Sequence, residues 1–396
     1  MGGTMEEAVI VSAVRTAIGA FNGALSAIPA TTLGAWVIAE AVRRAGIFAK
    51  EVDEVIMGNV LPAGLGQNPA RQASLRAKLP FESGAITVNK VCGSGLKAVM
   101  LAAQAIQTGD AEVVVAGGME NMNSAPYYLE RARSGYRMGD AKIIDGMVHD
   151  GLWDLNNDFH MGYSAELCAE KYGISRAEQD RYALRSYQRS LDAIAQGKFE
   201  AEILPIEVPA KKGSSLFFRV DETPRETSLE ALSALPSAFR KDGTVTAANS
   251  SKISDGASAL VLTSLSRAKK LDLRPRVRIM AQGAAGIDPK YVLVAPLYSI
   301  PKVLRKAGLK IEDIDLHEVN EAFASSTLAV MRELRIDPQR CNIRGGAISL
   351  GHPIGASGAR VLTTLLYAME EKKAKRGMAS LCLGGGEAVS LIVEKI

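Results

Sequence analysis

The sequence has few cysteines and histidines for its length and no long apolar run. Four of each occur among 396 residues. No two cysteines form a C-x-x-C pair, and the histidines lack zinc-ligand spacing, so we predict neither a disulfide framework nor a metal site. No apolar run approaches the ~18 residues that a membrane span requires. Reduced thiols and the lack of a membrane segment favour a cytoplasmic protein.

The chain also has only a small excess of charge of one sign. Lys and Arg number 47 against 43 Asp and Glu, which gives a formal net charge of +4. Because the two signs are interspersed, the basic stripe of a nucleic-acid-binding protein is not expected. A length of 396 residues exceeds what one hydrophobic core usually serves, so two or more core-bearing units are predicted.

An internal duplication organises the sequence. AVRRAGI, which ends at residue 47, and VLRKAGL, which ends at residue 309, are each followed by a short acidic turn and an apolar strand. Gly46 and Gly308 suit the left-handed position just past a helix C-terminus. Residues 87–120 and residues 347–394 share the same predicted order of elements, which is a strand, a glycine-rich turn, a helix and a buried strand. The repeat predicts two similar α/β halves whose strands are covered on both faces.

The stretch between the halves is more polar and aromatic. It contains a predicted helix at 175–197, opened by a capping box in which Ser175 precedes Glu178 by three residues. Inserted segments of this kind often bind substrate. The expected domains are an N-terminal half at 1–118, an inserted loop domain at 119–249, the completion of the first half at 250–273, and a C-terminal half at 274–396.

Four side chains follow predicted strands at the ends where the two halves can meet. Cys92 in V-C-G-S-G precedes a helix, whose N-terminus favours a thiolate. His352 in G-H-P-I-G-A-S-G lies 260 residues later and could take the thiol proton. Cys382 could exchange protons with a substrate carbon, and the glycines from Gly384 onward suit an oxyanion hole. Asn320 lies at a strand-to-helix turn, where its amide could hold a water or an acyl oxygen.

Each of these residues taken alone also fits a structural role. Most cysteines are inert core residues, and an asparagine at a strand-to-helix turn is commonly an N-cap. Competing motifs are missing from the sequence, which has no Walker A element, no full G-x-G-x-x-G and no G-x-S-x-G with an accompanying triad. The chemical interpretation therefore depends on the residues meeting in space.

Five motifs together resemble one family. VNKVCGSGLKAVMLA, GGMENMNSAPYYL, NEAFA, GGAISLGHPIGASGAR and C-x-GGG occur in the order found in thiolases, and the resemblance covers nearly the whole chain. Within that family the match is closest to the acetyl-CoA acetyltransferases. The resemblance implies an α/β fold with two mixed five-stranded sheets in α-β-α-β-α layers and a loop domain inserted in the first half.

The resemblance also implies a role for each candidate in a ping-pong acyl transfer between coenzyme A (CoA) thioesters. Cys92 matches the nucleophile that becomes acetylated, and His352 matches its base. Cys382 matches the acid/base that acts on the second acetyl-CoA. Asn320 matches the residue that positions a water in one oxyanion hole, which His352 completes, while the backbone N–H groups of Cys92 and Gly384 form the other.

Further residues match the substrate site of the family. No cofactor is implied beyond the substrates acetyl-CoA, acetoacetyl-CoA and CoA, and neither a nucleic acid nor a membrane is expected as a partner. Contacts to the CoA moiety and the acyl group are implied for Leu152, His160, Met161, Arg225, Ala247, Ser251 and Phe323.

Some positions depart from the usual family pattern. Val292 replaces a methionine that lines the acyl pocket, Arg344 stands in place of an asparagine, and Glu387 stands where an uncharged residue is common. These departures keep open a 3-ketoacyl-CoA thiolase for longer or branched chains. The APLYS and TAAN stretches with Tyr187 are similar to a subgroup activated by potassium.

Other functions remain as alternatives. A ketoacyl synthase fits less well, because those enzymes resemble a Cys-His-His set and Cys382 occupies the third position here. A non-catalytic acyl-CoA carrier, or a subunit of a larger complex, is also compatible with the sequence. Residues 120–139 resemble the loop that joins dimers into tetramers, so a homotetramer is expected.

Overall fold

The computed structural model describes residues 6–209 and 215–396, and a mixed β-sheet runs through it. The expected first half and insertion include residues 1–5 and 210–214, which lie outside the described part. The strand order is β15-β16-β17-β14-β1-β13-β5-β3-β4, with β10 beside β1 and β2 beside β13. The strands of this sheet are β1 (Ala8–Thr16), β2 (Gly19–Ala20), β3 (Glu54–Gly58), β4 (Gly84–Val88), β5 (Val113–Asn121), β10 (Ile203–Leu204), β13 (Ser254–Ser264), β14 (Val277–Gly286), β15 (Leu316–Val319), β16 (Arg376–Leu383) and β17 (Glu387–Lys395).

The sheet consists of one part from each half of the chain. Strands β4-β3-β5-β13-β1 form the first part and β14-β17-β16-β15 the second. They are joined by two residue pairs between β1 and β14, Val9 with Arg278 and Ile10 with Val277. The sequence predicted two five-stranded sheets. The second part has four named strands extended by a bridge between His317 and Cys341, and the β1–β14 pairing makes the two parts continuous.

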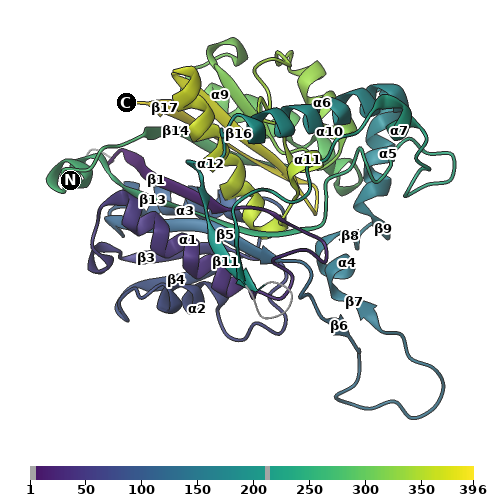
Figure 1. Cartoon of the computed structure of the whole chain (residues 1–396), viewed down its shortest axis with the longest axis horizontal. Coiled ribbons are helices and arrows are strands. Elements are labelled where there is room, and N and C mark those ends of the chain that lie inside the picture. Colours follow the sequence, from purple (N-terminus) through teal and green to yellow (C-terminus); the bar gives the residue numbers. More distant parts are fainter. Residues whose placement is uncertain (1–5, 210–214) are drawn as a thin grey trace.

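Helices lie outside and between the two parts of the sheet (Figure 1). Helices α3 (Ser94–Thr108) and α12 (Ile354–Lys372) contact strands of both parts and each other, so they form the middle layer. Helix α1 (Ala30–Ala45) covers the outer face of the first part beside α2, and α9 (Pro296–Ala307) covers the outer face of the second. The predicted α-β-α-β-α layering is therefore confirmed.

The remaining elements come from the chain between β5 and β13 and from the other connections between strands of the sheet. In Figure 1 the segment between β6 and β7 projects away from the body of the molecule. Among the helices described, none is both long and apolar enough to cross a membrane. The remaining helices are α2 (Pro69–Arg76), α4 (Gly146–Gly151), α5 (Met161–Lys171), α6 (Arg176–Ala195), α7 (Leu229–Ser233), α8 (Leu265–Lys270), α10 (Ala324–Glu333) and α11 (Ala347–Leu350), with 3-10 turns at Ala49–Glu51, Pro289–Val294 and Ile311–Asp313. The short hairpins pair β6 (Tyr127–Tyr128) with β7 (Ile144–Asp145), β8 (Trp153–Asp154) with β9 (Phe159–His160), and β11 (Ile206–Pro209) with β12 (Ser215–Phe218).

The local predictions on helix ends are confirmed. Gly46 and Gly308 follow α1 and α9 with φ of 71° and 67°, in the left-handed region where glycine carries no Cβ penalty. Ser175 and Glu178 form both bonds of the capping box that opens α6.

Glycine also sets the distance between the two halves beside the pocket. Gly118 near the end of β5 faces the first turn of α12, and a Cβ added to it would lie 2.1 Å from the carbonyl oxygen of Gly355. Backbone atoms cannot move aside as a flexible side chain can. Gly118 is therefore required by the close approach of α12 to the sheet, whereas Gly117 before it faces the backbone of Ser258 on the neighbouring strand β13.

We expect Gly118→Ala to lower the free energy of unfolding by about 2 kcal/mol or more, because the added methyl group must push two backbones apart. Gly84→Ala on β4 is the matched control, since the nearest atom to its added Cβ is 3.7 Å away. Denaturant midpoints measure both variants. Equal midpoints for the two variants would contradict the steric argument.

Candidate active site

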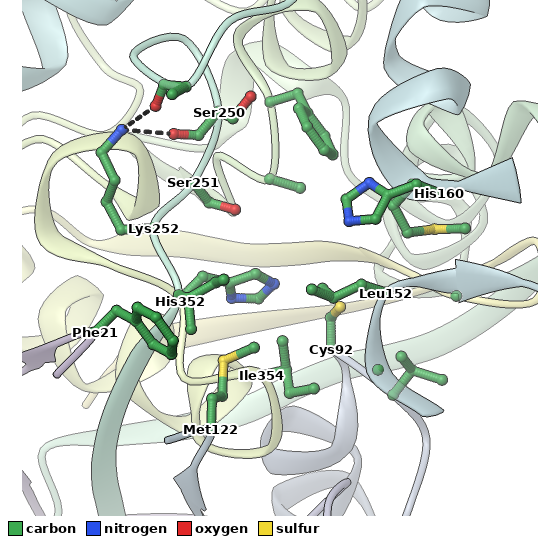
Figure 2. A pocket seen from close by; sticks show the side chains of 18 of the residues that line it. Phe21, Cys92, Met122, Leu152, His160, Ser250, Ser251, Lys252, His352 and Ile354 are labelled. Carbon is green, nitrogen blue, oxygen red and sulfur yellow. Dashed lines mark hydrogen bonds between the residues drawn. The ribbon is translucent and has the colours of Figure 1, made fainter. Parts of the chain in front are cut away.

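A pocket of about 640 Å³ opens between the loops of the two halves and the segment inserted between β5 and β13. Figure 2 shows Cys92 and His352 on one side of it and His160 on another. Every predicted site residue except Asn320 lines this pocket. The predicted residues brought together there are Cys92, His352, Cys382, Gly384, Leu152, His160, Met161, Arg225, Ala247, Ser251 and Phe323.

Cys92 lies in a tight turn that leads into α3. Val91 before it has φ of 44°, a conformation that β-branched residues rarely adopt. The hydroxyl of Ser94 holds the turn, because it accepts a hydrogen bond from the Lys90 N–H at 2.8 Å and donates to the Val91 carbonyl at 2.6 Å. The V-C-G-S-G motif thus holds Cys92 at the pocket wall.

Burial decides the resting protonation of this cysteine. It raises the pKa of the Cys92 thiol to about 12, although the backbone N–H groups of Gly384 and of Cys92 itself act in the opposite direction. The sequence favoured a thiolate because a helix follows. Backbone N–H groups of the turn do lower the pKa of Cys92, in the expected direction, but burial of the sulfur raises it by more. The Gly384 N–H lies close enough to the sulfur to lower its pKa, so it is a candidate donor to the oxygen of an acyl group on Cys92.

His352 is held by hydrogen bonds that define its tautomer. Its Nδ1 lies 2.6 Å from the hydroxyl oxygen of Ser357, and that hydroxyl donates to the Pro353 carbonyl at 2.9 Å. Since the hydroxyl proton is used for Pro353, Nδ1–H of His352 is the donor and Nε2 keeps its lone pair. Ser357 was missed by the sequence analysis, although it lies about one helical turn after His352 within the same motif.

The protonation of His352 suits a proton acceptor. Burial, together with the charge of Arg360, lowers the pKa of His352 to about 3, so the imidazole is neutral at physiological pH. Both pKa shifts favour a neutral thiol and a neutral imidazole in the resting site.

Cys382 approaches from the other half, one residue before the end of β16. Gly385 and Gly386 follow it with φ of 85°, which forms the turn into β17. Burial raises the pKa of the Cys382 thiol well above its usual range, and the nearby Cys92 sulfur raises it further. The two thiols are thus neutral neighbours in one pocket.

Asn320 lies behind the pocket wall. Its side-chain amide Nδ2 is 3.5 Å from Nε2 of His352, and its backbone N–H donates to the Ser380 carbonyl at 3.0 Å. Its Oδ1 is buried without a hydrogen-bond partner among the residues that the structure describes. A buried amide oxygen of this kind suits a bound water or a polar substrate atom.

A carboxyl group that the sequence analysis missed joins the two halves beneath the pocket. Glu120 at the end of β5 accepts bonds from the backbone N–H groups of Val60 and Gly355, both at 2.9 Å, and from the Asn59 amide at 2.6 Å. Burial raises the pKa of Glu120 to about 7. An acidic residue directly after the apolar run EVVVAGGM was the available signal.

The opposite wall contains aromatic side chains. The ring of His160 stacks on Phe239 at 4.8 Å, and Phe239 meets the edge of Phe323 at 6.1 Å. Burial lowers the pKa of His160, which is therefore a neutral wall residue. Phe239 was missed by the sequence analysis, because nothing in its local sequence distinguishes it from a core aromatic.

The three departures from the family pattern differ in position. Val292 lines the pocket, whereas Arg344 lies outside it and binds Glu202 and Glu371. Glu387 pairs with Lys90 at 2.5 Å, across the two loops that hold Cys92 and Gly384. Within the described ranges, no group of three or more His, Cys, Asp or Glu residues could hold a metal ion.

Comparison with known proteins agrees with this geometry. The family descriptions "Thiolase, N-terminal domain" and "Thiolase, C-terminal domain" match residues 8–266 and 273–395. Proteins named acetyl-CoA acetyltransferase from Pseudomonas aeruginosa and Cupriavidus necator are 54% and 52% identical to this chain, each over 99% of it and all of their own length. The crystal structure of the Bacillus anthracis acetyl-CoA acetyltransferase, 42% identical, superposes over all of both chains with a TM-score of 0.98. The chain therefore belongs to the thiolase family.

Proposed function

We propose that this protein is an acetyl-CoA C-acetyltransferase, which interconverts two acetyl-CoA with acetoacetyl-CoA and CoA. The observation that supports this most directly is that Cys92, His352 and Cys382 line one pocket, with the backbone N–H of Gly384 beside the Cys92 sulfur. The names of the similar proteins support the same reaction.

The first half-reaction forms an acyl-enzyme. Sγ of Cys92 attacks the thioester carbonyl of acetyl-CoA while Nε2 of His352 takes the thiol proton. The negative oxygen is stabilised by the backbone N–H groups of Cys92 and Gly384. When the carbon–sulfur bond to CoA breaks, the leaving thiolate takes a proton from Cys382. The products are acetyl-Cys92, free CoA, a Cys382 thiolate and a His352 imidazolium.

The second half-reaction forms the carbon–carbon bond. The Cys382 thiolate takes a proton from the methyl group of a second acetyl-CoA, and His352 with an Asn320-bound water stabilises the enolate oxygen. The carbanion then attacks the acyl carbon on Cys92. The carbon–sulfur bond of the acyl-enzyme breaks, Cys92 leaves as a thiolate, and it recovers its proton from His352.

The CoA arm is assigned to the wall that the predicted loop domain 119–249 supplies. Leu152, His160 and Met161 flank the path to Cys92, and Arg225 adds a positive charge at the pocket. Ala247 and Ser251 are assigned to the edge of the path for the pantetheine arm, and Phe323 closes the acyl pocket.

The homotetramer and the cytoplasmic location also belong to this proposal. The projecting segment between β6 and β7 supports the tetramer. It exposes large apolar side chains at Tyr127, Leu129, Tyr136, Met138 and Ile143.

The alternative is a 3-ketoacyl-CoA thiolase for longer or branched chains, which Val292 favours because it is shorter than the usual methionine. We expect thiolysis of acetoacetyl-CoA to exceed that of 3-ketohexanoyl-CoA at least about tenfold in kcat/KM, the size of effect that extra methylenes have in a closed apolar pocket. Similar rates on both substrates would favour the alternative, and a folded protein inactive on both would favour a non-catalytic carrier.

A further inference from the structure

The loop 246–252 connects the pocket wall to the proposed base. The Ser251 N–H donates to the Ala322 carbonyl at 2.9 Å, close to Asn320 and Phe323 in sequence. The His352 N–H donates to the Lys252 carbonyl at 3.0 Å. The position of the loop therefore affects both His352 and the turn that carries Asn320.

The side chain of Lys252 holds this loop together from within. Its ammonium group donates to the carbonyl of Ala247 and to the carbonyl of Ser250 at 3.1 Å, as the dashed lines in Figure 2 show. The same ammonium lies 5.6 Å from the ring centre of Tyr187, within cation–π range. One cation thus joins the two ends of a short loop to an aromatic ring.

The surroundings of Lys252 differ from those of an ordinary ion pair. No carboxylate in residues 6–209 or 215–396 forms a salt bridge with it, and the nearby charge is the cationic Arg225. Burial, with a smaller contribution from Arg225, lowers the pKa of Lys252 to about 7, so the ammonium form that binds both carbonyls predominates below neutral pH. The hydroxyl of Tyr187, a residue only 1% exposed, has no partner among the described atoms. Carbonyl oxygens, a hydroxyl and an aromatic face are the groups that commonly surround a monovalent cation.

The TAAN stretch and Tyr187 also suggested potassium activation. The residues present do not fit a potassium ion at the carbonyls of Ala247 and Ser250, because the Lys252 ammonium already binds both. The structure and the resemblance therefore disagree at this point.

We propose that Lys252 is a positioning residue whose ammonium group replaces an external monovalent cation, orders the loop 246–252 and so holds His352 in place. The expected effect of Lys252 on activity rests on the proposed function. The expected binding of potassium by a variant that lacks the ammonium group does not. The natural chain should respond little to potassium, and removal of the ammonium should create a response.

The test compares Lys252→Ala with the natural protein in choline chloride and in potassium chloride at equal ionic strength and at about pH 6, where Lys252 is protonated. In choline, we expect thiolysis by the variant to fall about tenfold in kcat, the effect of losing hydrogen bonds to a charged group. Potassium should restore at least about a third of the natural rate, while the natural protein changes less than about twofold. Lys241→Ala, an exposed lysine of the same segment, is the control that should behave as the natural protein.

A second measurement does not depend on activity. Potassium should raise the thermal midpoint of Lys252→Ala and leave that of the natural protein unchanged, because a ligand that binds only the folded state stabilises it. A variant whose rate and midpoint respond to potassium no more than the natural protein overturns the proposal. If the natural protein is inactive on acetoacetyl-CoA, the proposed function fails, and the midpoints alone decide whether Lys252 replaces a cation.

Discussion

Cys92→Ala is expected to reduce thiolysis of acetoacetyl-CoA by on the order of 10⁴-fold or more, because the proposed acyl-enzyme forms on its sulfur. The fold should persist, since Cys92 lies at the pocket wall and is only partly buried. Mass spectrometry after incubation with acetyl-CoA alone should find one acetyl group on Cys92 in the natural protein and none in the variant.

Cys168→Ala is the matched control, because this thiol is buried outside the pocket. It should retain the acetyl group on Cys92 and most of the activity. Undiminished turnover by Cys92→Ala would exclude an acyl-cysteine route, and acetylation at Cys382 in its place would reverse the roles of the two thiols.

His352→Asn should lower kcat by about 10² to 10⁴-fold, the usual contribution of a positioned general base. The variant loses the Nε2 acceptor, and the pKa of Cys92, about 12, leaves almost no thiolate at neutral pH. Its residual rate should therefore rise about tenfold per pH unit between about pH 7 and about pH 9, as the thiolate fraction grows. The natural protein should show no such rise.

The pKa of His352 also predicts how the stability of the native state depends on pH at acid pH. The folded-state pKa of His352 lies near 3, below its ordinary value of 6.5, so the unfolded chain binds the proton first. This residue therefore lowers the stability of the native state as the pH falls below about 6.5, and His352→Asn removes that contribution. The measurement is the ultraviolet absorbance of a thiolate at neutral pH. An absorbance that disappears in His352→Asn would show a resting ion pair of Cys92 and His352, and it would contradict both the raised pKa of Cys92 and the lowered pKa of His352.

Much of the fold and site could be predicted from the sequence, because the decisive signals are local. A glycine after a helix, a capping box and an apolar strand before a glycine-rich turn each act over a few residues. The duplication then indicated that the turns of Cys92 and His352 could meet. Ser357, Glu120 and Phe239 were missed, because their roles depend on partners that only the tertiary structure brings close.

The protonation of the thiols could not be predicted in the same way. A helix N-terminus is visible in a sequence, whereas the depth at which a sulfur is buried is not. Lys252 illustrates the same limit, since nothing in the surrounding sequence SSKIS marks it and its ammonium binds carbonyls that face it only in the folded loop.

The hydrogen bonds that the Glu120 carboxyl accepts from Val60 and Gly355 connect distant parts of the chain, and this has a consequence for synthesis on the ribosome. Cys92 is translated 260 residues before His352, and Gly355, which Glu120 needs as a donor, follows later still. Until the last part of the chain has emerged, the Cys92 thiol therefore lacks both its proposed proton acceptor His352 and the second thiol Cys382. A nascent or truncated chain can expose an ordinary cysteine but not the assembled set, so premature release should yield no partially active product.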